Sequence, residues 1–305
     1  MAPRHPRAMS DIRMGDWVDR FAPAMLRPYA RLARLDRPIG TWLLLFPCWW
    51  GIALAAQAWP DWSLMALFAI GAVVMRGAGC TFNDIVDRDF DGRVERTRTR
   101  PIPSGAVSLK SAAAFMVLQL AIGAAILVSL NAVAIGLGIA VLALVATYPF
   151  MKRITYWPQF FLGLNFNWGA LLGWAAVRGD LGWPPLLLYL GGIAWTLGYD
   201  TIYAHQDKED DALIGVKSSA LALGRLTRPF LFVFYAAACL LWALAGEAAG
   251  LGLPFRVVLV LAFFQLCWQA AKVDTEDPDD CLAKFKSNRV TGWLLLLGIV
   301  AAHVV

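Results

Sequence analysis

The most informative pattern in this sequence is a series of long apolar stretches separated by short polar segments. A helix needs about 20 apolar residues to cross about 30 Å of hydrocarbon, and nine stretches approach that length. They are centred near Phe46, Val73, Gln119, Val141, Ala170, Trp195, Ala238, Ala262 and Leu297. No ten-residue alternation typical of a membrane barrel is visible, and unpaired backbone groups are too costly in lipid. The pattern predicts an all-α, polytopic integral membrane protein with nine transmembrane helices.

The composition of the 305-residue chain agrees with this class. Apolar residues make up 59% of the chain and charged residues 16%, whereas ordinary globular proteins have about 45–50% and about 25%. A soluble protein of this size cannot bury so much apolar surface, and a disordered chain is far less hydrophobic. The five cysteines are scattered and form no C-x-x-C pair, which favours neither a disulfide framework nor a zinc site.

The distribution of basic residues predicts how the chain is oriented in the membrane. When the connections between predicted helices are assigned alternately to two sides, most of the 27 Lys and Arg residues fall on the side of the N-terminus. Arg178 and Arg256 lie on the opposite side, and Arg76 lies within the second helix. By the positive-inside rule the N-terminus is cytoplasmic and the C-terminus is outside. We expect a multi-pass protein of the bacterial inner (cytoplasmic) membrane.

The N-terminal segment differs from the rest of the chain. Residues 1–36 are rich in Arg and Pro and lack the apolar core of a secretory signal, so we expect a cytoplasmic juxtamembrane segment. A single transmembrane domain is predicted over residues 37–305. The arginines of the N-terminal segment would also suit a mitochondrial transit peptide. Asp11, Asp16 and Asp19 argue against that alternative, because transit peptides are poor in acidic residues.

A first acidic cluster lies at the cytoplasmic end of the second predicted helix. Asn83, Asp87 and Asp91 are spaced i, i+4, i+8, which puts them within about 80° on one helix face. Like charges at this spacing repel, and oxygen ligands without His or Cys favour Mg²⁺ or Mn²⁺. An EF-hand loop starting at Asp87 is excluded because its twelfth position is Arg98 instead of Glu. The alternative is a solvated helix end whose acids pair with the nearby Arg88, Arg93 and Arg96.

A second acidic cluster follows the sixth predicted helix. If the helix continues, Asp200, Asp207 and Asp211 fall within about 40° on one face, on the same side of the membrane as the first cluster. Two acidic helix ends facing each other would bind two or three Mg²⁺ ions, and such ions hold phosphates. His205 points about 140° away from Asp200 and is interpreted as a packing residue.

Basic residues near these clusters would neutralise a bound diphosphate. Arg76 is a candidate because ionisable residues inside a membrane span are usually functional. Lys152 and Arg153, at the end of the fourth predicted helix, are further candidates. Arg37, at the start of the first span, either binds lipid headgroups or holds an organic carboxylate.

At these residues the sequence resembles the UbiA superfamily of intramembrane prenyltransferases. The family motif N-D-x-x-D-x-x-x-D is present at 83–91, with Asp84 as its second residue, and R-P-x-x-S-G at 100–105. The segment 148–153 resembles the family's Y-P-x-x-K-R, and 207–211 its second acidic motif, followed by Gly215, Lys217 and Ser218. The resemblance extends from about residue 37 to the end of the chain. It is strongest to members that prenylate 4-hydroxybenzoate in the ubiquinone pathway.

The resemblance implies a bundle of nine helices around a central cavity, with Mg²⁺ as cofactor, and polyprenyl diphosphate and 4-hydroxybenzoate as substrates. No nucleic acid is expected, and the lipid bilayer is the other partner. The implied metal-binding residues are Asn83, Asp84, Asp87, Asp91, Asp207 and Asp211. Among these, Asp87, Asp91, Asp207 and Asp211 are the expected catalytic residues. Diphosphate would bind Arg76, Lys152 and Arg153, and the aromatic substrate would bind Arg37, Asp200 and Tyr203, with Arg76 an equal candidate for its carboxylate.

Two alternatives remain at this point. The acceptor could belong to the menaquinone, haem, chlorophyll or tocopherol pathway. The chain could instead be a divalent-cation transporter, but a transport pathway would place carboxylates near the bilayer midplane and on both sides. In this sequence they gather on one side.

Overall fold

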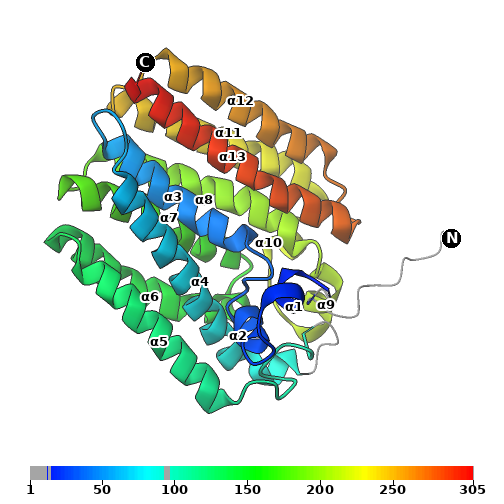
Figure 1. The fold of residues 1–305 in the computed structure, drawn as a ribbon. Helices are drawn as coiled ribbons and strands as arrows, with labels where there is room; N and C mark the ends of the chain where they lie inside the picture. The colour runs from blue at the N-terminus through cyan, green and yellow to red at the C-terminus, as the bar shows by residue number, and fades with distance from the viewer. Residues whose placement is uncertain (1–11, 13–14, 93–96, 305) are drawn as a thin grey trace. The chain divides into compact units, whose positions relative to one another are not determined.

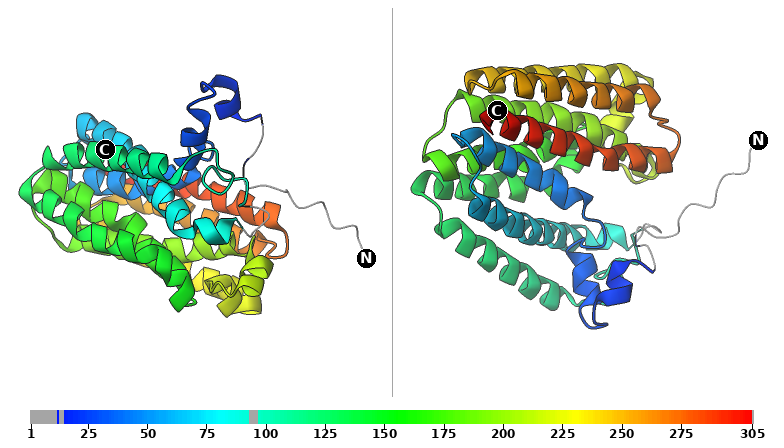
Figure 2. Two further views of the ribbon diagram at one scale, coloured as in Figure 1. Left: turned by 90° about the horizontal axis from the view of Figure 1, so that it is seen from below. Right: turned by 45° about the horizontal axis from the view of Figure 1, so that its top comes forward.

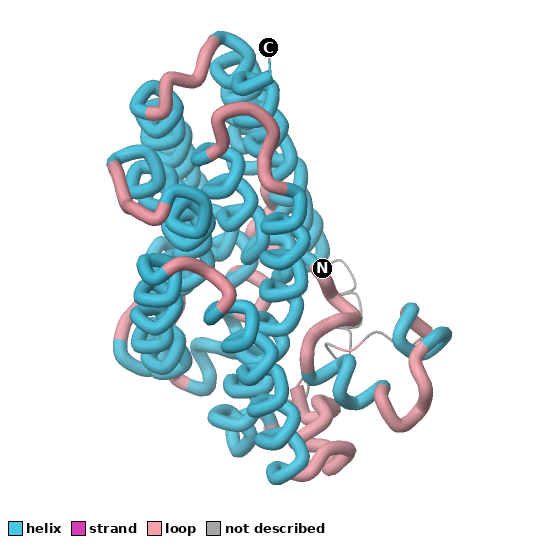
Figure 3. Tube along the Cα trace, turned by 60° about the vertical axis from the view of Figure 1, so that its left-hand side comes forward, coloured by secondary structure: helices cyan, strands magenta, loops and turns pink. Residues whose placement is uncertain are grey.

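The computed structural model describes residue 12 and residues 15–92 and 97–304, and the described residues form helices joined by loops, without strands (Figures 1 and 3). Of the predicted N-terminal segment, residues 1–11 and 13–14 lie outside this description, as do Arg93 and Arg96. The α-helices are α1 (Trp17–Phe21), α2 (Arg27–Leu32), α3 (Ile39–Ala55), α4 (Trp62–Asp91), α5 (Leu109–Val128), α6 (Ala132–Ile154), α7 (Pro158–Arg178), α8 (Trp183–Ala204), α9 (Lys208–Ile214), α10 (Ser219–Leu223), α11 (Thr227–Ala248), α12 (Leu253–Lys272) and α13 (Pro278–Val304). A short 3₁₀ helix, η1 (Gly224–Leu226), joins α10 to α11.

The chain is an all-helical, polytopic membrane protein. Within the described residues, six helical segments are long and apolar enough to cross a membrane: α4, α5, α6, α7, Ser219–Ala248 and α12. All nine predicted spans coincide with helices, namely these six together with α3, α8 and α13. The prediction of helices at these places is confirmed, while the count of nine membrane crossings stays a prediction.

Apolar side chains on the outside of α5 show why these helices need lipid. Val117, Leu118 and Val128 are each at least 58% exposed, and few residues of this helix are buried. Soluble proteins seldom leave such a continuous apolar surface in water. Hydrocarbon is the solvent that suits it.

The described chain forms two compact units, each considered separately below. The first comprises residues Met1–Thr41 and Ile70–Ile126, and the second comprises Trp42–Ala69 and Leu127–Val305. The predicted division at residue 37 is a different kind of boundary, based on sequence character, and stays a prediction.

The first unit is built around the contact between α4 and α5. Gly77 lies so close to the side chain of Gln119 that an added Cβ would be 2.1 Å from its nitrogen, and Gly123 is similarly close to Met75. Below this contact, Leu32 of α2 is fully buried in an apolar cluster with Val107 and Ala112. The cluster attaches the short helix α2 and the loop before α5 to the end of α4.

The second unit is centred on α8, which packs against α7, α11 and α13. The helices α11, α12 and α13 run side by side in this unit (Figure 2). Three glycines of α8 allow these close approaches, because side chains of the neighbouring helices occupy the space that their Cβ atoms would fill. Gly191 contacts Trp242 in this way, Gly192 contacts Asn167, and Gly198 contacts Tyr235.

A buried polar network also holds the second unit together. Trp195 Nε1 donates to Asn288 Oδ1 at 2.8 Å, and Asn288 Nδ2 donates to Gln269 Oε1 at 3.2 Å. The Tyr235 hydroxyl donates to the same Gln269 oxygen at 3.0 Å. Interhelical bonds of this kind replace water, which is absent from the interior of a membrane bundle. They fix α8, α11, α12 and α13 in one register.

Candidate functional site

The first acidic cluster (Asn83, Asp84, Asp87 and Asp91) lies on the last turns of α4, which is one continuous helix from Trp62 to Asp91. The predicted helical spacing of Asn83, Asp87 and Asp91 is therefore confirmed. Asp84, Asp87 and Asp91 are buried, with 1%, 7% and 8% of their surface exposed. Buried carboxylates must be paired or bound to a cation. The cluster is thus more than a solvated helix end.

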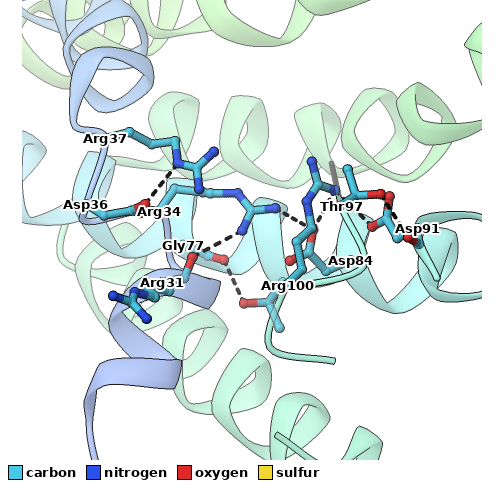
Figure 4. Close-up of polar contacts among 10 residues, drawn as sticks. Arg31, Arg34, Asp36, Arg37, Gly77, Asp84, Asp91, Thr97 and Arg100 are labelled. Atoms are coloured by element: carbon cyan, nitrogen blue, oxygen red, sulfur yellow. Dashed lines mark hydrogen bonds and ion pairs between the residues drawn. The ribbon is translucent and has the colours of Figure 1, made fainter. Parts of the chain in front are cut away.

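Two arginines bind the carboxylates of this cluster (Figure 4). Arg34 Nη2 lies 2.7 Å from Asp84 Oδ1. Arg100 Nη1 lies 2.8 Å from Asp91 Oδ2 and 3.5 Å from Asp84 Oδ1. Asp84 therefore contacts two guanidinium groups that come from different parts of the chain. Arg34 precedes α3, and Arg100 lies in the loop after α4. Arg34 was not among the predicted site residues, and Arg100 entered the sequence analysis only as the first residue of the R-P-x-x-S-G motif at 100–105.

The backbone of Arg34 has the left-handed conformation, with φ at 57°. For a residue other than glycine this conformation costs about 1–2 kcal/mol. The Arg34 amide donates to Arg31 O, and the guanidinium reaches both Arg31 O and Asp84. The turn thus directs the Arg34 side chain into the first unit. In sequence, Arg34 is one of several arginines between 27 and 37, and no local signal distinguishes it.

Arg37 and Arg76 have different surroundings. Arg37 Nε lies 3.0 Å from the carboxylate of its neighbour Asp36. The guanidinium of Arg76 lies against Gly40, since a Cβ on that glycine would be 2.7 Å from Arg76 Nη2. The side chain of Arg76 thus extends from α4 and packs against the first turn of α3. The two arginines that were candidates for a substrate carboxylate both lie near the start of α3.

The second acidic cluster does not lie on one helix, and the prediction of a continuous helix from Asp200 to Asp211 is wrong. Helix α8 ends at Ala204 and α9 begins at Lys208. The amides of His205, Gln206 and Asp207 bond three residues back, to Ile202, Tyr203 and Ala204, which tightens the last turn and changes the direction of the chain. Asp200 stays on α8, whereas Asp207 is the residue just before α9 and Asp211 lies within it. Asp207 and Asp211 are both partly buried.

His205 lies at this break and contacts α11. Its Nε2 lies 2.9 Å from the Thr227 hydroxyl, which itself donates to Gly224 O at 2.8 Å. Nε2 is therefore the donor and Nδ1 the unprotonated nitrogen. The pKa of His205 is lowered from 6.5 to about 4, mainly by burial and also by the charge of Lys208, with Glu276 acting in the opposite direction. The ring is neutral at neutral pH. His205 is a packing residue, as expected, and its hydrogen bond to Thr227 connects the end of α8 to the start of α11.

The remaining predicted residues of the second unit lie on α6 and α8. Lys152 and Arg153 are in the last turn of α6. The backbone amide of Lys217 donates to Lys152 O at 2.9 Å, so the segment after α9 lies beside this turn. On α8, Asp200 is partly buried, and the Tyr203 ring packs on Phe285 of α13 with 4.6 Å between centroids.

The donor chemistry of both acidic clusters is that of a magnesium site. All predicted ligands offer carboxylate or amide oxygens, which Mg²⁺ prefers. Within the part of the chain that the structure describes, no three His, Cys, Asp or Glu side chains converge closely enough to hold a metal ion by themselves. Arg34 and Arg100 both contact Oδ1 of Asp84, and its expected place among the ligands stays a prediction.

Comparisons with known proteins agree with the motif pattern. The sequence profile of the UbiA prenyltransferase family matches residues 44–301. Mitochondrial 4-hydroxybenzoate polyprenyltransferase of Rattus norvegicus is 51% identical over 286 residues, which are 93% of this chain and 76% of the rat protein. The protein of the same description from Arabidopsis thaliana is 49% identical over 293 residues, covering 95% of this chain and 72% of its own length.

Solved structures share the fold. The apo structure of a UbiA homologue from Aeropyrum pernix K1 superposes with a TM-score of 0.71 at 28% identity, covering 85% of this chain and 97% of that one. A UbiA homologue from Archaeoglobus fulgidus, solved bound to GPP and Mg²⁺, has a TM-score of 0.66 at 17% identity, covering 90% of this chain and 99% of that one.

Proposed function

Because the chain belongs to the UbiA prenyltransferase family, we propose that it transfers a polyprenyl group from polyprenyl diphosphate to 4-hydroxybenzoate. The single observation that carries this function is the identity of about half of all residues, over more than 90% of the chain, to proteins described as 4-hydroxybenzoate polyprenyltransferases. The chain is an enzyme, and its reaction is a step of ubiquinone biosynthesis. Identity at this level over nearly the whole chain supports this acceptor over those of the other quinone, haem, chlorophyll and tocopherol pathways.

Asn83, Asp87 and Asp91 of the first acidic cluster, together with Asp207 and Asp211, would hold Mg²⁺. The metal supplies positive charge that offsets the negative charge on the leaving diphosphate. Asp84 is proposed as a positioning residue, since Arg34 and Arg100 both contact Oδ1 of its carboxylate. The oxygen-only donor set supports magnesium in particular.

The diphosphate oxygens would be bound by Lys152 and Arg153 at the end of α6 and by Arg76. Charge-assisted hydrogen bonds from these donors strengthen as the bond between the allylic carbon and the diphosphate oxygen breaks, because the leaving oxygen gains charge. The diphosphate departs with the bonding electron pair. These donors therefore stabilise the transition state for ionisation more than they stabilise the bound diphosphate substrate.

Arg37 would hold the carboxylate of 4-hydroxybenzoate, with Arg76 as the other candidate, and Asp200 or Tyr203 would orient the phenol. The ring carbon ortho to the hydroxyl then forms the new carbon–carbon bond, and loss of its proton restores aromaticity. Tyr203 is well placed for an orienting role, because its packing on Phe285 fixes the plane of its ring.

For the membrane arrangement, we propose that all nine helices cross the bilayer around a central cavity. The N-terminal segment 1–36 and the site then lie on the cytoplasmic side of a bacterial inner membrane, followed by the transmembrane domain 37–305. The positive-inside distribution supports this orientation. The relatives above are described as mitochondrial, and a topologically equivalent inner membrane would suit the same chain.

An acceptor panel tests the proposed function. Membranes containing the protein are incubated with labelled polyprenyl diphosphate and 4-hydroxybenzoate, homogentisate or 1,4-dihydroxy-2-naphthoate, with Mg²⁺ or with a chelator. We expect labelled product only with 4-hydroxybenzoate and only with the metal. Transfer to another acceptor would replace the substrate assignment, and divalent-cation flux without any transfer would favour a transporter.

A further inference from the structure

Arg100 occupies the position that a metal ion at Asp91 would compete for. Its Nη1 atom lies 2.8 Å from Asp91 Oδ2 and 3.5 Å from Asp84 Oδ1, so one guanidinium bridges two carboxylates of the first acidic cluster (Figure 4). With Arg34 also on Asp84, two guanidinium groups and two carboxylates form a connected row of ion pairs.

The backbone around Arg100 is fixed by local hydrogen bonds. Thr97 Oγ1 donates to Asp91 O, the Arg100 amide donates to Thr97 O, and the Ser104 amide donates to Arg100 O. The loop continues to Val107, which is buried in the apolar cluster with Leu32. The Arg100 side chain therefore starts from a fixed point, and it can change partners without rearrangement of the loop.

A divalent cation at Asp91 would compete with this arrangement. It would share the carboxylate that now accepts from Arg100, and a guanidinium beside a dication is repelled. A diphosphate reverses this relation, because its oxygens attract both the metal and the guanidinium. Asp84, paired with Arg34, offers Arg100 a second partner while Asp91 turns to the metal.

We propose that Arg100 is the resident counter-cation of the first acidic cluster and that it couples metal binding to diphosphate binding. Without diphosphate, Arg100 holds Asp91 and keeps metal affinity low. When diphosphate arrives, Arg100 moves from Asp91 to the diphosphate and the metal takes its place. This inference rests on the proposed function, since it requires Asp91 to be a metal ligand.

Removal of Arg100 should change the affinity for the metal in opposite directions, depending on whether Arg100 competes with the metal or only forms a structural ion pair. If Arg100 only stabilised the end of α4, its removal would loosen Asp91 and weaken metal binding. If Arg100 competes with the metal, its removal strengthens binding of the metal alone and reduces the additional gain from diphosphate. Arg88 provides a matched control, because it is a partly exposed arginine of the same helix end and pairs with Asp89 instead.

The experiment measures Mn²⁺ binding to the purified full-length protein by the loss of the free-ion EPR signal, with and without inorganic diphosphate. The association of Mn²⁺ with diphosphate is measured separately and subtracted. We compare the unaltered protein with Arg100→Gln, Arg100→Lys and Arg88→Gln, and thermal unfolding confirms that each variant is folded. Arg100→Lys keeps the charge, and Arg100→Met, which removes the charge but keeps an unbranched side chain, replaces Arg100→Gln if that variant does not fold.

We expect Arg100→Gln to bind Mn²⁺ alone about fivefold tighter or more, with a smaller gain from diphosphate, and Arg88→Gln to change little. Arg100→Lys should stay close to the unaltered protein in the absence of diphosphate. Equal or weaker Mn²⁺ binding by Arg100→Gln overturns the coupling but leaves the metal site intact. Failure of the unaltered protein to bind Mn²⁺ even with diphosphate, matched by Asp91→Asn and Asp207→Asn, overturns the metal site itself.

Discussion

The two acidic clusters share a four-residue spacing of carboxylates but have different supports. Asp87 and Asp91 lie on the unbroken helix α4 and are buried, and Asp91 has the guanidinium of Arg100 beside it. Asp207 and Asp211 belong to the seven-residue helix α9 and the residue before it, and they are less buried. The first cluster is positioned by a long helix and by ion pairs. The second is positioned by a tight turn and a neutral hydrogen bond from His205 to Thr227.

This difference shows that equal spacing in sequence does not give equal rigidity. A helix of 30 residues holds its side chains at fixed angles, whereas a helix of seven residues is too short to be stable by itself. The position of α9 depends on its tertiary contacts. We therefore expect the first cluster to be preformed and the second to be adjustable.

The largest expected effect on prenyl transfer comes from removing a single carboxylate from either cluster. Asp87→Ala and Asp207→Ala should each reduce prenyl transfer about a thousandfold or more, because the charge on the leaving diphosphate is no longer offset. Transfer of labelled polyprenyl groups in membranes with equal amounts of protein is the measurement. Asp89→Ala and Glu209→Ala are matched controls, since both side chains are exposed. Retained transfer in Asp207→Ala alone would limit the metal site to the first cluster.

The next largest effect concerns Asp84. Asp84→Asn leaves Arg34 buried without its counter-charge, which should lower the free energy of unfolding by about 3–5 kcal/mol. Thermal unfolding in detergent measures this loss. In the double variant with Arg34→Gln, the combined loss should be smaller than the sum of the single losses.

A contrary result for Asp84 would be equally informative. If Asp84→Asn keeps its stability but loses Mn²⁺ binding, then Asp84 is a metal ligand, as the motif implied. Asp89→Asn, on the same helix with an exposed side chain, should change neither property.

A smaller effect is expected at the break between α8 and α9. His205→Phe and Thr227→Val each remove the hydrogen bond that fixes the turn before Asp207, which should raise the KM for Mg²⁺ about three- to tenfold. The kcat at saturating Mg²⁺ should change less, since the ligands themselves remain. Steady-state kinetics over a range of Mg²⁺ concentrations separates the two parameters. If kcat falls and KM does not, His205 acts on the chemical step instead of on the position of α9.

The smallest effect is expected from the ion pair between Lys208 and the exposed Glu276. Lys208→Ala should change stability by less than about 1 kcal/mol and transfer by less than about twofold, because solvated ion pairs contribute little. A large loss of activity would mean that α9 is also held by charge, and the contrast between the two clusters would then disappear.

Much of the fold follows directly from the sequence. Apolar stretches of nearly 20 residues predict where the long helices lie, and the spacing of Asn83, Asp87 and Asp91 is preserved because α4 continues to Asp91. The partners of Asp84 could not be predicted, because Arg34 is 50 positions away in sequence. The break after α8 was also hidden, since no glycine or proline lies between Asp200 and Asp211. It results from tightened backbone bonds and from the contact of His205 with a distant helix.

The polar network of the second unit has a consequence for how the protein is made. Asn288 of α13 and Gln269 of α12 raise the free energy of placing each helix alone in hydrocarbon. Their side-chain oxygens accept hydrogen bonds from other helices once α8, α11, α12 and α13 are together. Helix α13 leaves the ribosome after α8, α11 and α12. Its insertion should therefore depend on helices that precede it in the chain, are already in the bilayer and carry polar side chains that can bond to it. A chain that assembled wrongly would present these amides to lipid, where the membrane's quality-control proteases could recognise it.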